Sequence, residues 1–165
     1  MDVLLAALVI VAALSPNPSV KSSDGQPACM ALHEAHDAMN MRGEHGMGFS
    51  QTATTHHFLL TPDGGIIEVN AKSDDAAARD EIHMHLTHIS HAFAAGEFDI
   101  PMFVHDTVPP GVLDMKRLQS RIHYTFEETA AGGRVVIKTD DAEALAAIHK
   151  FLRFQIDEHQ TVDPH

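Results

Sequence analysis

The chain has 165 residues and a formal net charge of -12 with histidine counted as neutral, from 11 Lys and Arg against 23 Asp and Glu. This acidic balance argues against a nucleic-acid or anionic-membrane partner, because both require clustered basic side chains. The length suits one domain and a leader. There are also 14 histidines, so the net charge depends strongly on pH near the ordinary imidazole pKa of about 6.5.

The chain begins with an apolar run at residues 3–14, VLLAALVIVAAL, followed by small and helix-breaking residues. The run has the length of a signal peptide and is too short to span a bilayer. We therefore expect a leader at residues 1–22 and an exported, periplasmic protein, although no Lys or Arg precedes the run. Beyond this leader we expect no contact with a membrane. Cys29 is the single cysteine, so the fold cannot depend on an internal disulfide.

Residues 23–54 are expected to form a short N-terminal helix and a linker. The helix is predicted to run from Pro27, which suits a first turn, to Gly43, which suits a stop. The segment that follows, GEHGMGFSQTATT, is rich in Gly and Thr and is typical of a connector.

Residues 55–165 are predicted to form one domain of two strand-strand-helix units. The first unit, at 55–100, has two strands joined by the turn sequence PDGG and a helix that begins near Ser73. The second unit, with a short tail, occupies residues 121–165. Residues 101–120 between the units are expected to be a connecting loop followed by a short helix.

The two units also resemble each other in sequence. Residues 58–65, FLLTPDGG, align with 126–133, FEETAAGG, and residues 82–91, IHMHLTHISH, align with 148–157, IHKFLRFQID. Internal duplication would explain this recurrence, but strand-strand-helix units are common enough for chance to explain it as well. Either way, the element order predicts an α+β fold with a four-stranded antiparallel sheet, two long helices on one of its faces and the short N-terminal helix.

The first long helix carries His83, His85, His88 and His91 beside an apolar stripe. On a helical wheel, His85 flanks this stripe and His88 and His91 lie progressively further from it. His83 lies on the other flank, where we expect it to face solvent. Because His85 and His88 are three residues apart, they can share a metal ion from one face of the helix.

The aligned positions in the second long helix favour His85 and His88 over the other two. Phe151 and Phe154 occupy those positions, and a soluble protein rarely leaves two phenylalanines exposed together on one helix. This flank is therefore expected to be half-buried against the other helix, the N-terminal segment or a second subunit. Half-buried imidazoles need polar partners, which a metal ion would supply.

Other histidines are candidates by their positions in the predicted elements. His56 is expected on the helix-facing side of the first strand and His57 on its open side, because successive strand residues alternate. His105 lies in the connecting loop, where binding groups are often found. His149 lies at the edge of the apolar stripe of the last helix, and His159 continues that stripe at the end of the helix.

A second, softer set of candidate ligands lies on the N-terminal helix. Cys29, His33, His36 and Met39 fall on one of its faces, and thiolate, thioether and imidazole together favour copper(I) or zinc over hard cations. An amphipathic helix that packs its Met and Cys side chains against the sheet would have the same pattern.

The chain resembles a family of small exported bacterial proteins of unestablished function. The resemblance is carried by three stretches, GMGFSQTATTHHFLLTPDGGIIEV, IPMFVHDTVPPGV and AIHKFLRFQIDEHQTVDP, within about residues 46–164. It implies export and a shared fold. Members of that family sometimes carry the automatic label aspartate carbamoyltransferase. This chain has no Ser-Thr-Arg-Thr loop for carbamoyl phosphate, so we do not expect that activity.

The same resemblance implies a set of candidate functional histidines. The family pattern is similar at His56, His57, His88, His105, His149 and His159. The chain departs from the family at Val162, where the family more often has Gly in a TGDP ending. The Cys, His and Met residues of the N-terminal helix are not part of the family pattern.

These patterns lead to the hypothesis of an exported protein that binds copper or zinc for buffering or delivery. The first expected ligands are His56, His85 and His88, and the further candidates are His57, His105, His149 and His159. One alternative is a small metal-dependent or acid-base enzyme, although no phosphate loop, dinucleotide-binding glycine pattern or nucleophile elbow is present. The other is a homodimer that binds haem or another apolar ligand beside Phe151 and Phe154.

Overall fold

The structure is a computed structural model, and it describes residues 27–165. The side chains of residues 27–33, 35 and 36 are also outside the described part. The expected leader at residues 1–22 and the side chains of the candidate ligands Cys29, His33 and His36 therefore lie outside the described residues.

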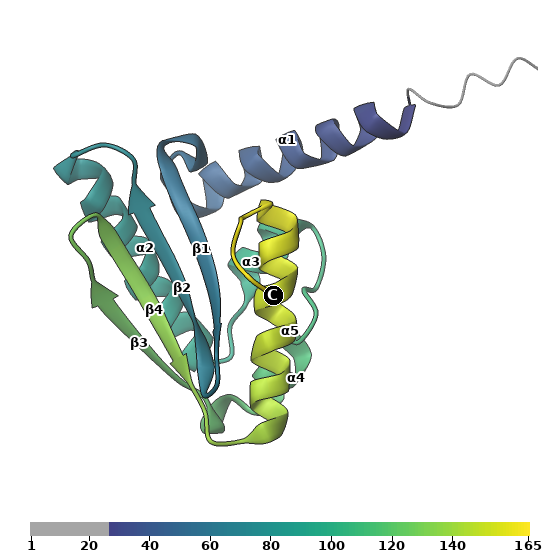
Figure 1. Cartoon of the computed structure of the whole chain (residues 1–165), viewed down its shortest axis with the longest axis vertical. Coiled ribbons are helices and arrows are strands. Elements are labelled where there is room, and N and C mark those ends of the chain that lie inside the picture. Colours follow the sequence, from purple (N-terminus) through teal and green to yellow (C-terminus); the bar gives the residue numbers. More distant parts are fainter. Residues whose placement is uncertain (1–26) are drawn as a thin grey trace, which may run out of the picture.

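The described chain folds into a sheet covered by helices (Figure 1). In chain order its elements are α1 (Pro27–Met47), the 3-10 turn η1 (Gln51–Ala53), β1 (Thr54–Thr61), β2 (Gly64–Ala71), α2 (Ala76–Ala94), α3 (Asp99–His105), α4 (Val112–Arg117), the 3-10 turn η2 (Gln119–Arg121), β3 (His123–Glu128), β4 (Gly132–Lys138) and α5 (Ala142–His159). Two strand-strand-helix units, β1-β2-α2 and β3-β4-α5, are therefore present as predicted.

The four strands form one antiparallel sheet in the order β1-β2-β4-β3. The long helices α2 and α5 both pack on it, which confirms the predicted α+β fold. α1 lies at the end of the sheet where β1 begins and extends beyond the sheet (Figure 1). Within residues 27–165, no helix combines the length and apolar character that crossing a membrane requires.

The strand pairing relates the two halves of the sheet by an approximate two-fold axis. In the first hairpin Phe58 pairs with Ile67, and in the second the aligned residues Phe126 and Val135 pair in the same way. The hairpins meet where Ile67 pairs with Val135, so each of these residues lies beside its own counterpart. The recurrence in sequence thus corresponds to an equivalence in space, which supports internal duplication.

Each long helix packs on the hairpin of the other half. A Cβ atom at Gly133 of β4 would lie 3.3 Å from Leu86 Cδ1 of α2, and one at Gly65 of β2 would lie 2.1 Å from Leu152 Cδ1 of α5. Both glycines lie on the sheet face that carries Ile67, because side chains alternate along a strand. The two helices therefore cover the same face, and the missing side chains let them approach it closely.

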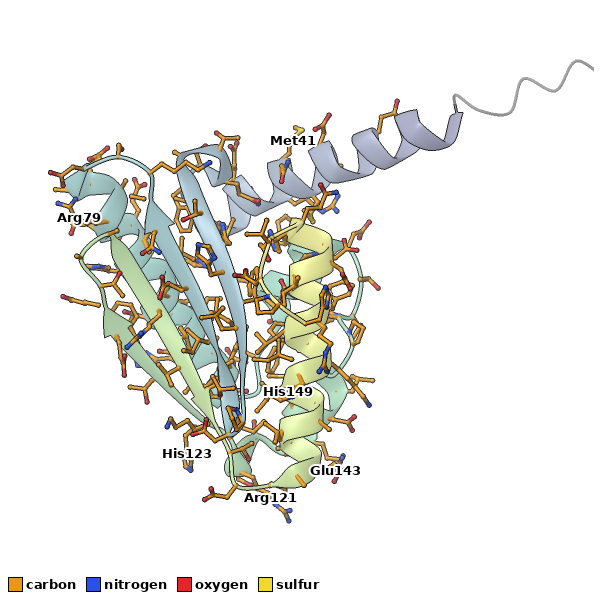
Figure 2. All side chains as sticks on the ribbon, viewed as in Figure 1. Met41, Arg79, Arg121, His123, Glu143 and His149 are labelled. Carbon is orange, nitrogen blue, oxygen red and sulfur yellow. The ribbon has the colours of Figure 1, made fainter. Side chains whose placement is uncertain are left out.

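Two histidines form hydrogen bonds that link each long helix to the hairpin of the other half. His83 of α2 donates its Nε2–H to the Gly132 carbonyl oxygen at 2.7 Å. At the aligned position of α5, His149 donates its Nε2–H to the carbonyl oxygens of Gly64 at 3.0 Å and Thr61 at 2.9 Å, in the turn of the β1-β2 hairpin (Figure 2). The expectation that His83 faces solvent is wrong, because its side chain is only 24% exposed beneath the other hairpin.

Two helices differ from the prediction. α1 continues through Gly43 to Met47, and the loop expected around His105 instead contains α3. Pro101 does not prevent this helix, since it lies in the first turn, where backbone N–H groups have no helical acceptor. Asp106, in a left-handed conformation with φ of 52°, ends the helix.

An aromatic cluster fills the space between the long helices. Phe93 stacks on Phe98 with ring centroids 4.3 Å apart, and Phe151 contacts these two rings at 5.9 and 6.1 Å. Phe154 is half-buried and contacts the ring of His105 at 5.0 Å. Elements of the same chain therefore cover the Phe151 and Phe154 flank, as the sequence predicts for a flank that faces the other helix.

The close approach of α5 to β2 predicts that Gly65→Ala destabilises the protein. The added Cβ would lie 2.1 Å from Leu152 Cδ1 and 2.9 Å from the Leu59 carbonyl oxygen, so the helix or the sheet must shift. Such overpacking lowers the free energy of unfolding by roughly 1–3 kcal/mol, which urea denaturation measures. Gly46→Ala is the matched control, since its Cβ meets no atom closer than 3.6 Å. Equal stability of the two variants would contradict the packing described.

Candidate functional site

A small cavity lies under the helices near the start of β1. Its volume is about 70 Å³, and its walls are mostly apolar side chains. Four histidines line it together with an amide and a thioether: His56, His85, His105, His159, Gln155 and Met47. Imidazoles gathered around an otherwise apolar space make this cavity the strongest candidate for a functional site.

β1 places His56 on the helix-facing side of the sheet, as its alternation with Phe58 predicts. Its ring contacts those of Phe49 at 6.2 Å, Phe58 at 6.5 Å and His159 at 5.6 Å. Its Nε2 atom is buried and has no hydrogen-bond partner among the described residues. Aromatic contacts thus hold the ring, while one of its nitrogens is left to bind a ligand.

In the other half of the fold, the positions equivalent to His56 and His159 carry a tyrosine and a phenylalanine. Extending each alignment by two residues matches His56 with Tyr124 and His159 with Phe93. The rings of Tyr124 and Phe93 contact each other at 5.8 Å, and those of His56 and His159 at 5.6 Å. Packing at such a place therefore does not require nitrogen atoms, although the Tyr124 hydroxyl there is also buried without a hydrogen-bond partner among the described residues.

His105 reaches the cavity from the last turn of α3, 5.2 Å from the ring of His159. Its Nε2 lies 3.0 Å from Oε1 of Gln155, so we assign the proton of the neutral ring to Nε2 and a lone pair to Nδ1. Nδ1 is buried without a hydrogen-bond partner among the described residues. The Glu158 Oε2 atom lies 3.7 Å from it, which is too far for a hydrogen bond.

α2 contributes His85 to the same cavity. The ring of His85 meets the Phe49 ring edge-on at 5.4 Å, so that Phe49 contacts both His56 and His85. The aligned residue of α5, Phe151, is buried in the core. The prediction of a half-buried flank therefore holds at His85.

Burial keeps these imidazoles in their neutral form. It lowers the pKa of His56 and the pKa of His85 to about 4 in each case. It also lowers the pKa of His105, although the hydrogen bond to Gln155 opposes this shift. Neutral imidazole is the form that coordinates a metal ion.

Three of the predicted metal ligands lie away from the cavity. His88 is exposed on α2 and lines an open surface groove with His91. His57 lies on the other face of β1, where its Nδ1–H donates to Asp163 Oδ1 at 3.0 Å. His149 donates to backbone carbonyls, as described above. The cavity thus brings together two of the first expected ligands, His56 and His85, and two of the further candidates, His105 and His159. His88, the remaining first expected ligand, is not part of it.

The candidate set on α1 is described in part only. Met39 is buried, with 3% of its surface exposed. The side chains of Cys29, His33 and His36 lie outside the described residues.

Among the side chains that the structure describes, no three from His, Cys, Asp or Glu converge closely enough to hold a metal ion. The rings of His56 and His159 are nearly parallel, with 17° between their planes. Binding of an ion by these side chains therefore requires them to turn.

Sequence reasoning missed Gln155 and Phe49. Gln155 is 4% exposed and aligns with the apolar residue Ile89, so a polar residue at a core position was the available signal. Phe49 lies in the Gly- and Thr-rich segment that the sequence predicts to be a connector, and nothing in that pattern places it against His56 and His85.

No protein-family model, curated protein or solved structure matches this chain. The resemblance to a family of exported proteins stays a prediction, and the case for function rests on the geometry of the cavity.

The lowered pKa values of His56 and His85 predict that acid destabilises the metal-free protein. As the pH falls below 6.5, the unfolded chain takes up a proton at each residue, whereas the folded protein does so only near about 4. The stability they contribute is complete above pH 6.5 and is lost as the pH falls toward 4, by at most about 1.4 kcal/mol per pH unit for each residue.

Urea denaturation between pH 7.5 and 4.5 measures this loss. The double variant His56→Gln, His85→Gln is expected to lose stability less steeply with falling pH than the unaltered protein. His88→Gln, which removes an exposed imidazole from the same helix, serves as the control. If the double variant had the same dependence on pH as the unaltered protein, the buried neutral state of these residues would be refuted.

Proposed function

We propose that this protein binds one transition-metal ion in the cavity, with His56, His105 and His159 as ligands. The observation that carries the proposal is the burial of two imidazole nitrogens, His56 Nε2 and His105 Nδ1, without hydrogen-bond partners among the described residues. A buried polar atom without a partner costs about 1–3 kcal/mol. Coordination of a metal ion would remove that cost at both nitrogens.

The spacing of the rings is compatible with a shared ion. Metal-nitrogen bonds of about 2.0 Å place the centroids of two imidazoles on one ion about 5 Å apart. The ring of His159 lies 5.6 Å from that of His56 and 5.2 Å from that of His105. Binding then requires rotation about side-chain bonds that turns the nitrogens toward a common point.

Copper(I) suits this cavity better than zinc. Met47 lines the cavity and can add a thioether sulfur, a soft ligand that favours copper(I). No Asp or Glu is among the described residues that line the cavity, and the one carboxylate placed near its ligand atoms above, that of Glu158 at 3.7 Å from His105 Nδ1, is 45% exposed and therefore screened by solvent. A buried charge without a counter-charge is costly, and a monovalent ion carries half the charge of Zn²⁺.

The size of the cavity supports a metal ion over an organic ligand. Its volume of about 70 Å³ is well below the roughly 300–1,000 Å³ of pockets that hold organic ligands. Haem or another large apolar ligand would require the helices to separate. Together with the expected leader, a small histidine site fits the binding and delivery of copper outside the cytoplasm.

Titration with copper(I) against a competing chelator tests this proposal, with Cys29→Ser as the background so that the set on α1 does not compete. One equivalent is expected to bind, and His159→Gln is expected to weaken binding by at least ~100-fold, since even the loss of an outer hydrogen-bond partner costs 10–100-fold. His88→Gln is the matched control and should bind as the parent does.

Two results would contradict the proposal. One is the absence of binding by the parent protein. The other is equal weakening of copper(I) binding by the His159→Gln and His88→Gln substitutions, because binding would then depend on exposed His88 of α2 as much as on the cavity. A zinc affinity above that for copper(I) would overturn the choice of metal and leave the choice of ligands intact.

A further inference from the structure

A second and larger hollow adjoins the histidine cavity from outside. It has a volume of about 410 Å³ and lies beside the first residues of β1, between η1 and the chain that follows α5. His56 and His159 line both hollows. Their stacked rings therefore separate a small apolar cavity from an open polar cleft.

The charge of this cleft differs from that of the whole chain. The protein has a formal net charge of -12, yet no Asp or Glu is among the described residues that line the cleft. Lys72 is the lining residue with a full charge. It donates one hydrogen bond to the Thr52 carbonyl oxygen at 2.9 Å, and an ammonium group has three N–H donors. The cleft thus offers a cation, and the Asp163 carboxylate beside its lining residue His57 is already bound by that imidazole and by the Phe58 N–H.

Apolar atoms make up more of the remaining wall than polar atoms do, and its other polar groups carry no full charge. Threonine hydroxyls and glutamine amides line it, among them Thr55 and Gln160, which are exposed. Such groups recognise hydroxyl and carboxyl oxygens of a ligand by hydrogen bonds. Gln51 also lines the cleft, but its Nε2 amide group is buried against Gly43 of α1 and is not available to a ligand.

We propose that this cleft binds a small organic anion, a carboxylate that also carries a hydroxyl group. Lys72 pairs with the carboxylate, and the threonine and Gln160 side chains bind the remaining oxygens. The volume of about 410 Å³ is in the range of pockets for organic ligands, and it is larger than an inorganic anion needs. The proposal does not depend on the metal site, since the cleft is present without a bound metal ion.

Isothermal titration of the metal-free protein with L-malate at low ionic strength tests this proposal. One molecule is expected to bind, and Lys72→Gln is expected to weaken binding about ten-fold or more, because a hydrogen bond to a charged group is lost. Lys150→Gln is the matched control: it removes the same charge from an exposed position on α5 and should leave the affinity unchanged. Malamide, the neutral diamide of malate, should not bind the unaltered protein.

Several outcomes would overturn the proposal. Absence of binding by malate, citrate and succinate would exclude an organic anion, and equal binding of inorganic phosphate would show an inorganic anion site. Equal weakening of malate binding by Lys72→Gln and Lys150→Gln would show that the anion responds to the net charge of the protein and not to the cleft. Copper(I) titration of the Lys72→Gln variant distinguishes a failure of this proposal from a failure of the metal-site proposal. The variant should bind copper(I) as the unaltered protein does, because the cavity ligands are intact.

Discussion

The contact of each long helix with a glycine of the other half is the constraint on which the rest of the structure depends. Leu152 reaches the sheet at Gly65 and Leu86 reaches it at Gly133, because neither glycine has a side chain to keep the helix away. Because each long helix packs on the hairpin of the other half, the sheet and the helices form one core. Near the start of β1 the strands carry larger residues on this face, and the histidine cavity lies there between sheet and helices.

The approximate two-fold symmetry of the fold allows its two ends to be compared, and the comparison singles out the end with the candidate site. At equivalent places one end has the rings of Tyr124 and Phe93, and the other has the rings of His56 and His159. Both pairs satisfy the packing, but only the second has nitrogen atoms that can bind a ligand. Burial then lowers the imidazole pKa of His56 and leaves its Nε2 without a hydrogen-bond partner among the described residues. The same side chains that complete the core are therefore chemically suited to coordination.

Much of the fold could be predicted from the sequence, because hairpin turns and helix periodicity are local signals. The turn at Gly64 and the register of both hairpins follow from such signals. The position of His105 on a helix was not predicted, because α3 is only seven residues long and lies in a segment that the sequence predicted to be a loop. The roles of His83 and His149 could not be predicted, because their acceptors are backbone carbonyls of the other half, far away in the sequence. Alternation placed His56 correctly, whereas helix spacing alone could not separate His85 from exposed His88.

The central claim is that His56, His105 and His159 coordinate copper(I), whereas His83 and His149 fasten the helices to the sheet and His88 and His91 face solvent. Side-chain ¹⁵N spectra of the histidines, recorded before and after one equivalent of copper(I), test it most directly. The account predicts that the imidazole resonances of His56, His105 and His159 move, while those of His83 and His149 keep the pattern of rings protonated at Nε2. Movement of the His88 and His91 resonances, with those of the cavity histidines unchanged, would contradict it.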